Sequence, residues 1–194
     1  MRSLHSIRLF LVAICISVVS CVCSQAQDLT QVIKRELSLS YSTMESNKVH
    51  SQSFWMQGVT FADAERITAR LSAVVEVSSA HADHMPGASF GIDLITVMIG
   101  PRYSRNRFHG KVRMHGEVLG GGAYAFNSIF PNSDEGSTSA SGLALLMGGS
   151  ADYRINEHLS YRVADAAWVR TRLSNGTSSA QNNLRLGSGI VFRF

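Results

Sequence analysis

Apolar and polar residues alternate one by one along much of this chain. The last thirteen residues show the pattern most clearly, because one face of an extended segment would be apolar and the other polar, apart from Val191. The apolar face comprises Leu184, Leu186, Ile190, Phe192 and Phe194. A period of two is that of a β-strand, whereas an amphipathic helix spaces its apolar residues three and four apart. The alternation therefore predicts an all-β protein.

Eight segments carry enough of this pattern to be predicted as strands. Their ranges are 34–42, 54–62, 68–78, 92–100, 111–119, 142–154, 161–173 and 182–194. The best candidate for an amphipathic helix is 63–75, whose apolar residues have helical spacing. We favour a turn followed by a strand there.

The connections between these segments alternate in length. The first, third, fifth and seventh are longer on balance than the second, fourth and sixth, and the longest covers 120–141. Short turns at one end and longer loops at the other are typical of an even-stranded outer-membrane barrel. Closure of the sheet lets every backbone hydrogen bond form between strands, as a lipid environment requires. We therefore predict an eight-stranded antiparallel up-and-down transmembrane β-barrel.

The N-terminal segment has the features of a signal peptide. Arg2 and Arg8 form a basic region, residues 9–20 are apolar, and Ser24-Gln25-Ala26 provides a small-x-small cleavage site. We predict a signal peptide at 1–26 and a barrel domain at 27–194. Alternatively, residues 18–21 resemble a lipobox, which would leave an acylated Cys21 at the mature N-terminus. Either interpretation predicts export.

Charge and cysteine content narrow the possible partners. The leader holds two of the 18 basic residues and none of the 14 acidic ones, so residues 27–194 carry a formal charge of +2. A charge so close to balance gives no reason to expect nucleic acid as a partner. All three cysteines lie at positions 15–23, so the predicted barrel contains no disulfide bond.

The polar faces of the predicted strands collect charged residues of both signs. An eight-stranded barrel encloses only enough space for its own side chains, and an unpaired buried charge is costly. We therefore expect ion pairs that plug the lumen. The candidates are Glu36, Arg70, Glu76, Arg113, His115, Glu117, Asp165 and Arg185, and Asp152 and Arg193 lie on the same polar faces.

Three segments carry a resemblance to a known family: Ile99-Gly100-Pro101-Arg102-Tyr103-Ser104, Gln181-Asn182-Asn183-Leu184-Arg185, and the terminal Gly189-Ile190-Val191-Phe192-Arg193-Phe194. In the last of them, Gly189, Phe192 and Phe194 resemble the C-terminal assembly signal of outer-membrane barrels. Over nearly all of 27–194, the chain resembles small eight-stranded outer-membrane barrels of the OmpA, OmpX and opacity-protein type, and more closely those of soil-dwelling acidobacteria. The resemblance implies outer-membrane lipid and the barrel assembly machinery as partners, and it implies no catalytic residues.

Three other groups of residues suggest chemistry, and for each we favour a structural interpretation. His115 and Glu117, with nearby serines, have the residue types of a barrel lipid hydrolase. His81-Ala82-Asp83-His84 offers metal ligands within one loop, but no further ligand has a suggestive spacing. Gly120-Gly121-Gly122 lacks a phosphate-loop pattern. We expect no catalytic residue, no metal and no cofactor.

The predicted function is an envelope-stabilising or adhesion-like surface role for an integral outer-membrane barrel. The main alternative is an exported soluble or lipid-anchored barrel that binds an apolar ligand, as lipocalins do. A barrel lipid hydrolase and a narrow pore are further alternatives. The strand faces distinguish the first two, because a lipocalin-like barrel would turn its apolar residues inward and its charged residues outward.

Overall fold

The structure is a computed structural model, and it describes residues 35–46, 53–84, 90–130, 137–173 and 180–194. The predicted signal peptide at 1–26 lies outside these ranges, so its cleavage or lipidation and the boundary at residue 27 stay predictions. Within the described ranges, no helix is long and apolar enough to cross a membrane.

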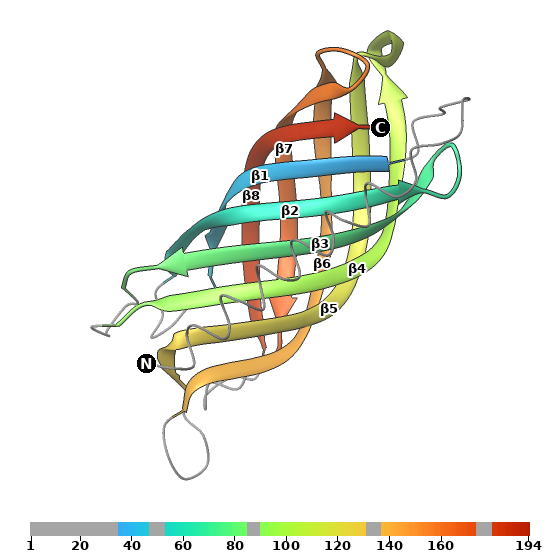
Figure 1. Cartoon of the computed structure of the whole chain (residues 1–194). Helices are drawn as coiled ribbons and strands as arrows, with labels where there is room; N and C mark the ends of the chain where they lie inside the picture. Colours follow the sequence, from blue (N-terminus) through green and yellow to red (C-terminus); the bar gives the residue numbers. More distant parts are fainter. Residues whose placement is uncertain (1–34, 47–52, 85–89, 131–136, 174–179) are drawn as a thin grey trace. The chain divides into compact units, whose positions relative to one another are not determined.

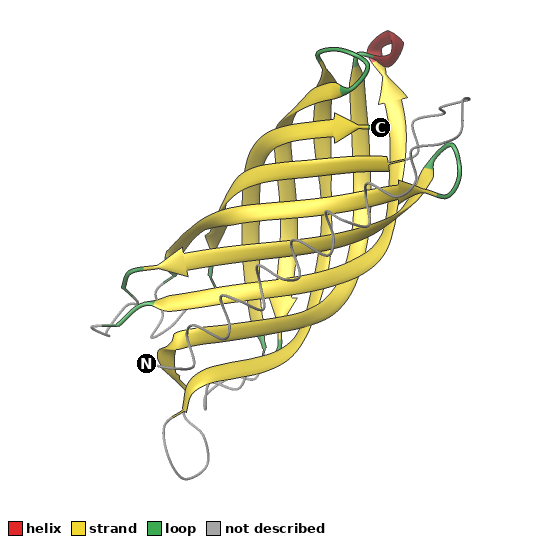
Figure 2. Ribbon diagram, in the orientation of Figure 1, coloured by secondary structure: helices red, strands yellow, loops and turns green. Residues whose placement is uncertain are grey.

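Eight β-strands make up most of the described chain (Figures 1 and 2). They are β1 (Arg35–Glu45), β2 (Trp55–Arg66), β3 (Leu71–Ala82), β4 (Ile92–Arg107), β5 (Val112–Phe130), β6 (Ser137–Arg154), β7 (Leu159–Thr171) and β8 (Gln181–Arg193), with the 3₁₀ turn η2 (Phe108–Gly110) after β4. Each strand pairs antiparallel with the next along the chain, and β8 pairs with β1 to close the sheet. The predicted eight-stranded antiparallel up-and-down barrel is confirmed.

The first and last strands meet at a regular seam. The amide of Arg35 donates to the carbonyl of Phe194 at 3.1 Å, and the amide of Phe194 donates back to Arg35 at 2.9 Å. Further along the seam, a Cβ atom on Gly189 would lie 2.1 Å from the carbonyl oxygen of Leu39. No side chain fits at this position, so glycine allows β8 to approach β1 closely.

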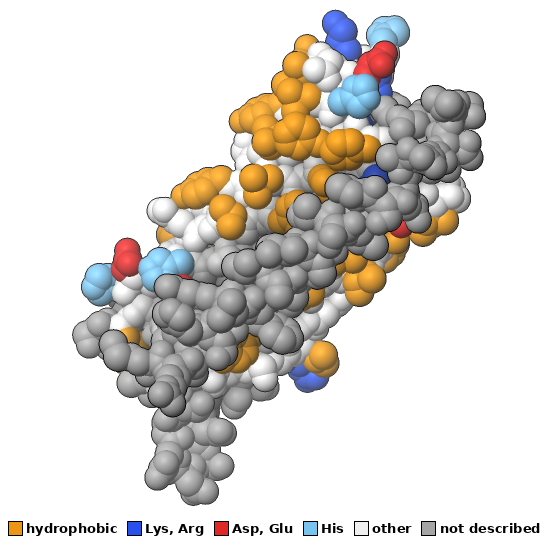
Figure 3. Space-filling view, viewed as in Figure 1, with side chains coloured by type: hydrophobic (Ala, Val, Ile, Leu, Met, Phe, Trp, Pro, Cys, Tyr) orange, Lys and Arg blue, Asp and Glu red, His pale blue; other side chains and the backbone are white. Residues whose placement is uncertain are grey.

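The two faces of the wall differ in polarity. Burial alternates residue by residue along most strands, and the outward positions are mainly apolar, as the space-filling view shows for one side of the barrel (Figure 3). Large apolar side chains on this outer face include Leu39, Val59, Val75, Val97, Ile99, Val118, Leu143, Leu145, Met147, Leu184, Leu186 and Ile190. The inward positions hold serines, apolar residues from alanine to methionine and leucine, and many of the charged residues of the strands.

Two predicted connections are wrong. The segment 120–141 is mostly strand, because β5 runs through three glycines to Phe130 and β6 begins at Ser137. A Cβ atom on Gly121 would lie 2.0 Å from the carbonyl oxygen of Val97, so glycine here serves close packing between strands rather than a loop. The predicted connection between the strands 92–100 and 111–119 also belongs mainly to a strand, since β4 continues to Arg107.

The connections separate the barrel into two ends. The end that holds Arg35 and Phe194, which we call the short-turn end, also holds the turns 67–70, 108–111 and 155–158. At the opposite long-loop end, the strands are joined by 46–54, 83–91, 131–136 and 172–180. The predicted alternation of short and long connections is therefore confirmed, although the fifth connection is shorter than predicted.

Candidate functional site

The inside of the barrel has two halves of different chemistry. Along β1, the inward side chain nearest the short-turn end is Glu36, three serines follow, and Met44 lies toward the long-loop end. Along β5, His115 and Glu117 precede Leu119 in the same direction. We call the part near the long loops the apolar half. It comprises Met44, Met56, Ala80, Ala82, Leu94, Ala123, Ala125, Ala144, Leu146, Val169 and Leu173.

We call the rest of the lumen the charged half, and Glu36 is one of its two centres. Its Oε1 accepts a hydrogen bond from Nη1 of Arg102 at 3.3 Å. Its Oε2 accepts from Nη1 of Arg113 at 3.1 Å and from Nε of Arg193 at 3.0 Å. A single buried carboxylate thus holds guanidinium groups from β4, β5 and β8.

Asp152 on β6 is the second centre. Its Oδ1 accepts from Nε of Arg162 at 2.9 Å, and its Oδ2 lies 2.8 Å from Nε2 of His115. Arg193 joins the two centres, because its Nη2 lies 3.4 Å from Oδ2 of Asp152 while its Nε binds Glu36. Arg193 also donates to the hydroxyl of Ser160.

Three further acids extend this arrangement. Arg102 donates through Nε to Glu117 at 2.7 Å, and Arg162 donates to Asp165 at 3.3 Å. Arg185 binds both oxygens of Glu76, at 2.6 and 3.0 Å, and lies 3.7 Å from Asp165. The result is one connected set, the lumen network, with five carboxylates, five guanidinium groups and one imidazole. Its members are Glu36, Glu76, Arg102, Arg113, His115, Glu117, Asp152, Arg162, Asp165, Arg185 and Arg193.

The lumen network connects seven of the eight strands, all except β2. Almost all of its side chains are buried, and the charges of its acids and arginines balance. A buried ion pair adds little net stability over an apolar pair of similar size, but removing one partner leaves an uncompensated charge that costs about 3–5 kcal/mol. The network therefore fills the charged half and strongly favours the native pairing of these side chains over partial arrangements.

Seven of the eight residues predicted to form lumen ion pairs belong to the lumen network. The prediction for Arg70 is wrong, because this residue is exposed in the turn between β2 and β3. Thr68 determines where β3 begins: its hydroxyl accepts hydrogen bonds from the amides of Arg70, at 3.4 Å, and Leu71, at 3.1 Å. The first inward residue of β3 is therefore Ser72.

The sequence prediction missed Arg102 and Arg162. Arg102 lies in the predicted connection between 92–100 and 111–119. It faces the lumen because β4 extends beyond the predicted strand to Arg107. Arg162 and Asp165 both face inward although they are three residues apart, because a register shift between them interrupts the alternation. The presence of both Arg162 and Asp165 in one predicted strand could have indicated an inward ion pair. A strict period of two, however, places these two residues on opposite faces.

One row of hydrogen bonds contains the residue types of a serine hydrolase. The hydroxyl of Ser104 lies 2.9 Å from Nδ1 of His115, whose Nε2 faces Asp152. The predicted neighbour Glu117 instead binds Arg102. Ser104 is 3 % exposed and lies inside the lumen, so its hydroxyl does not face an open surface where a substrate would bind. The row orients the imidazole within the lumen network.

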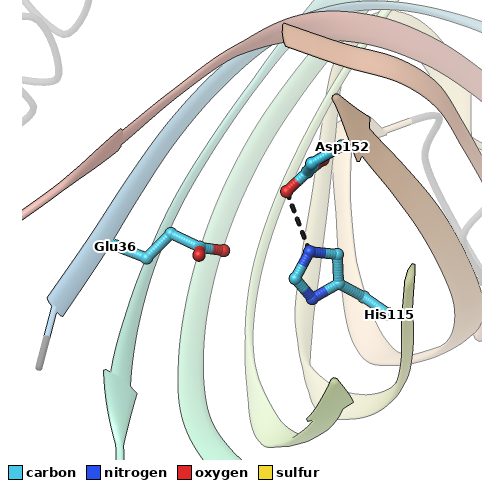
Figure 4. Close-up of side chains that lie close together, drawn as sticks. All are labelled: Glu36, His115 and Asp152. Atoms are coloured by element: carbon cyan, nitrogen blue, oxygen red, sulfur yellow. Dashed lines mark hydrogen bonds and ion pairs between the residues drawn. The ribbon is translucent and has the colours of Figure 1, made fainter. Parts of the chain in front are cut away.

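The acids and histidine of the network also have the types of metal ligands. One ligand atom from each of Glu36, His115 and Asp152 lies within 4.8 Å of the others, and the three side chains point toward one another from β1, β5 and β6 (Figure 4). However, the carboxylate oxygens already accept hydrogen bonds from arginines, whose charge opposes a cation at this position. The geometry fits an ion-pair network better than a metal centre.

The motif at 81–84 lies at the long-loop end. Nδ1 of His81 lies 2.7 Å from Asp93, and its Nε2 lies 3.0 Å from Asp83. His81 is exposed, and both of its ring nitrogens are engaged by carboxylates. These contacts connect the ends of β3 and β4 and agree with the interpretation as surface residues.

No protein-family model matches the sequence, and no curated protein matches it. Solved structures do match the fold. The attachment invasion locus protein Ail of Yersinia pestis is 12 % identical, with 84 % of this chain and 100 % of that chain covered and a TM-score of 0.55. Neisserial surface protein A is 15 % identical, with 82 % and 97 % covered and a TM-score of 0.59. Ail bound to the heparin analogue sucrose octasulfate also matches, at 15 % identity, 84 % and 100 % coverage and a TM-score of 0.53. At these identities, the matches show a similarity of fold.

Proposed function

We propose that this chain is an integral outer-membrane barrel that is plugged by its lumen network and has a structural or surface-interaction role. The observation that carries the proposal is the orientation of the strand faces. Large apolar side chains such as Leu143 and Leu145 face outward, whereas the lumen network faces inward. A lipocalin-like soluble barrel requires the opposite arrangement.

The composition of the outer face supports lipid as its surroundings. An apolar surface that surrounds a protein is far larger than the patches that soluble monomers expose. Aromatic side chains lie on this surface toward both ends, as expected for residues at the two membrane–water interfaces. Toward the long-loop end these are Tyr41, Trp55, Tyr124 and Trp168, and toward the short-turn end they are Tyr103, Tyr153, Tyr161, Phe192 and Phe194.

The connections support an orientation within the membrane. Outer-membrane barrels place short turns in the periplasm and longer loops outside. We infer that the short-turn end faces the periplasm and that the four longer connections face the exterior, where they would contact surface partners. The similarity in fold to a protein named for attachment and to a surface protein favours this class of role over an enzymatic one.

The C-terminal residues support recognition by the barrel assembly machinery. Phe192 is exposed on the outer face of β8, Phe194 is exposed directly after it, and Gly189 lies at the seam with β1. Changing Phe194 to Asp would remove an interfacial anchor and an apolar edge. We expect reduced levels of folded barrel in cells, measured in the outer-membrane fraction. Normal levels would mean that this residue is not part of an assembly signal.

Cysteine labelling tests the proposal, since residues 27–194 contain no cysteine. Leu143 and Leu145 face outward, and Ala144 and Leu146, on the same strand, face inward and serve as matched controls. In membranes, single cysteines at 143 and 145 should react with a lipid-phase maleimide, and those at 144 and 146 should not. Recovery of the protein in the soluble periplasmic fraction, or labelling from the aqueous phase at 143 and 145, would contradict the proposal.

A further inference from the structure

Exposed cations gather at the short-turn end, beyond the apolar outer face of the barrel. We call five of them the basic rim: Arg70, Arg105, Arg107, Lys111 and Arg154. Backbone hydrogen bonds hold their segments next to one another. The amide of Ser104 donates to the carbonyl of Arg70, and the amide of Arg154 donates to the carbonyl of Lys111, both at 2.8 Å. Residues from two turns and from the ends of β4 and β6 therefore form one surface.

Strand β4 determines the depth of two of these cations. Toward the short-turn end, its outward side chains are first the apolar Val97 and Ile99 and then the aromatic Tyr103. Arg105 and Arg107 follow on the same face. With about 3.3 Å per residue, Arg105 follows Tyr103 by roughly 7 Å along the strand. This order places the guanidinium groups at the level of lipid headgroups, directly past the aromatic residue that marks the interface.

The basic rim has little compensating charge. The nearest acids on β5 and β6, Glu117 and Asp152, are buried and paired within the lumen network. Among the residues that the structure describes, no ion pair joins a cation of the basic rim to an acid. Of the exposed acids nearby, Glu157 is in the turn after β6, and Glu65 is on β2. The surface is therefore complementary to an anion.

The turns that carry the cations also expose large apolar side chains. Ile67, Phe108 and Ile155 occupy the three short turns and are 64 %, 74 % and 58 % exposed. Apolar side chains next to cations are typical of segments that lie in the interface of an anionic bilayer. A soluble anionic polymer would account for the cations but not for these side chains, so the combination favours lipid.

We propose that the basic rim binds the phosphate groups of anionic phospholipids in the leaflet that surrounds the short-turn end. This inference rests on the proposed function, because it requires the barrel to span a membrane. Guanidinium groups bind phosphate through paired hydrogen bonds, and cations near an anionic leaflet are attracted to it. The rim thereby selects the lipids that surround one end of the barrel.

Two arginines at the opposite end provide a matched control. Arg170 near the end of β7 and Arg172 directly after it are two residues apart at the long-loop end, as Arg105 and Arg107 are at the short-turn end of β4. Both are exposed, and they lie on the outer side of the alternation. Neutralising either pair removes the same charge from the same kind of position but from different ends of the barrel.

The test uses the full chain without its predicted leader, refolded into phosphatidylcholine vesicles with a trace of spin-labelled phosphatidylglycerol or phosphatidylcholine. The ratio of their association constants reports lipid selectivity, and a heat-dependent gel shift reports insertion. We expect the unaltered barrel to prefer phosphatidylglycerol. R105Q/R107Q should lower this preference by up to about fivefold per charge, and K111Q should lower it less. R170Q/R172Q, which lies outside the basic rim, should retain more of the preference than R105Q/R107Q.

Each other outcome has a definite meaning. Failure of the unaltered chain to insert contradicts the proposed function, and the inference with it. Insertion without a preference for phosphatidylglycerol contradicts the inference alone, as does an equal loss in R170Q/R172Q. Binding of soluble polyglutamate to the detergent-folded barrel through the same arginines, without lipid preference, would make the partner an anionic polymer and overturn the lipid proposal. If R105Q/R107Q does not fold, K111Q in the turn decides.

Discussion

The charged half and the apolar half of the lumen fill the same narrow barrel by different means. In the charged half, long side chains from opposite walls meet through directed hydrogen bonds, as between Arg185 and Glu76. In the apolar half, alanines pack with Met44, Met56, Leu94 and Leu146 through van der Waals contacts that have no directed hydrogen bonds. One half therefore depends on the identity of particular partners, and the other depends mainly on volume.

This difference predicts different responses to substitution. Loss of one charged partner leaves a buried charge without compensation, whereas loss of both can be nearly neutral. Loss of a methyl or isobutyl group in the apolar half costs its transfer free energy and the energy of the cavity, whatever its neighbours are. The two halves can thus be compared through single and paired substitutions measured in the same refolded barrel.

The largest expected effect is that of Asp152→Ala. Asp152 is contacted by His115, Arg162 and Arg193, so its removal leaves the lumen network one buried carboxylate short. Arg162 then keeps only Asp165, and Arg193 keeps only Glu36. We expect the free energy of unfolding to fall by about 3–5 kcal/mol, measured by denaturant titration of the barrel refolded in detergent. Ser72→Ala, an inward substitution without charge, should change it far less. Equal values for the two variants would show that the charged half does not depend on pairing.

A smaller effect is expected for Leu146→Ala in the apolar half. Leu146 is fully buried, and its truncation should lower the free energy of unfolding by about 2–5 kcal/mol, toward the lower end if neighbouring side chains relax. The matched control is Leu145→Ala, one position away on the outer surface. In detergent, which solvates that surface, the control should cost less. The opposite order would mean that the inward face is not the packed one.

The paired substitution Glu76→Leu with Arg185→Met should have a smaller effect than either single change. Each single change leaves one buried charge with weaker compensation, and together they leave an apolar pair of similar volume. We expect the double variant to unfold within about 1 kcal/mol of the unaltered barrel, measured as a double-mutant cycle. Additive losses would indicate that Arg185 acts mainly through Asp165, its second partner.

How much of this organisation could be predicted from the sequence depends on how local its causes are. Strand alternation is local, so the eight strands and most inward charges followed from a period of two, with Glu76 and Arg185 as examples. Arg70 was misplaced because the hydroxyl of Thr68 positions the turn, and alternation alone does not record where a strand begins. Arg162 was missed because the register shift before Asp165 reverses the inward positions.

Longer-range features could not be predicted in this way. Glycine is usual both in loops and where backbones approach closely, and only the pairing of Gly121 with β4 distinguishes the two. The connections within the lumen network and the clustering of the basic rim depend on which turns meet at one end of the closed barrel. Residues such as Arg70 and Arg154 are far apart in sequence, and no local pattern joins them.

The smallest expected effect concerns ion conduction and tests how the two halves combine. Arg193→Ala loosens the charged half by removing contacts to Glu36 and Asp152. The apolar half would still oppose ions, because an ion loses its hydration shell there without gaining polar partners. In planar bilayers we expect no steady conductance from the unaltered barrel and none from Arg193→Ala, whereas Arg193→Ala combined with Leu146→Ser should conduct weakly. Steady conductance from Arg193→Ala alone would mean that the lumen network by itself closes the barrel, and steady conductance from the unaltered barrel would favour a narrow pore.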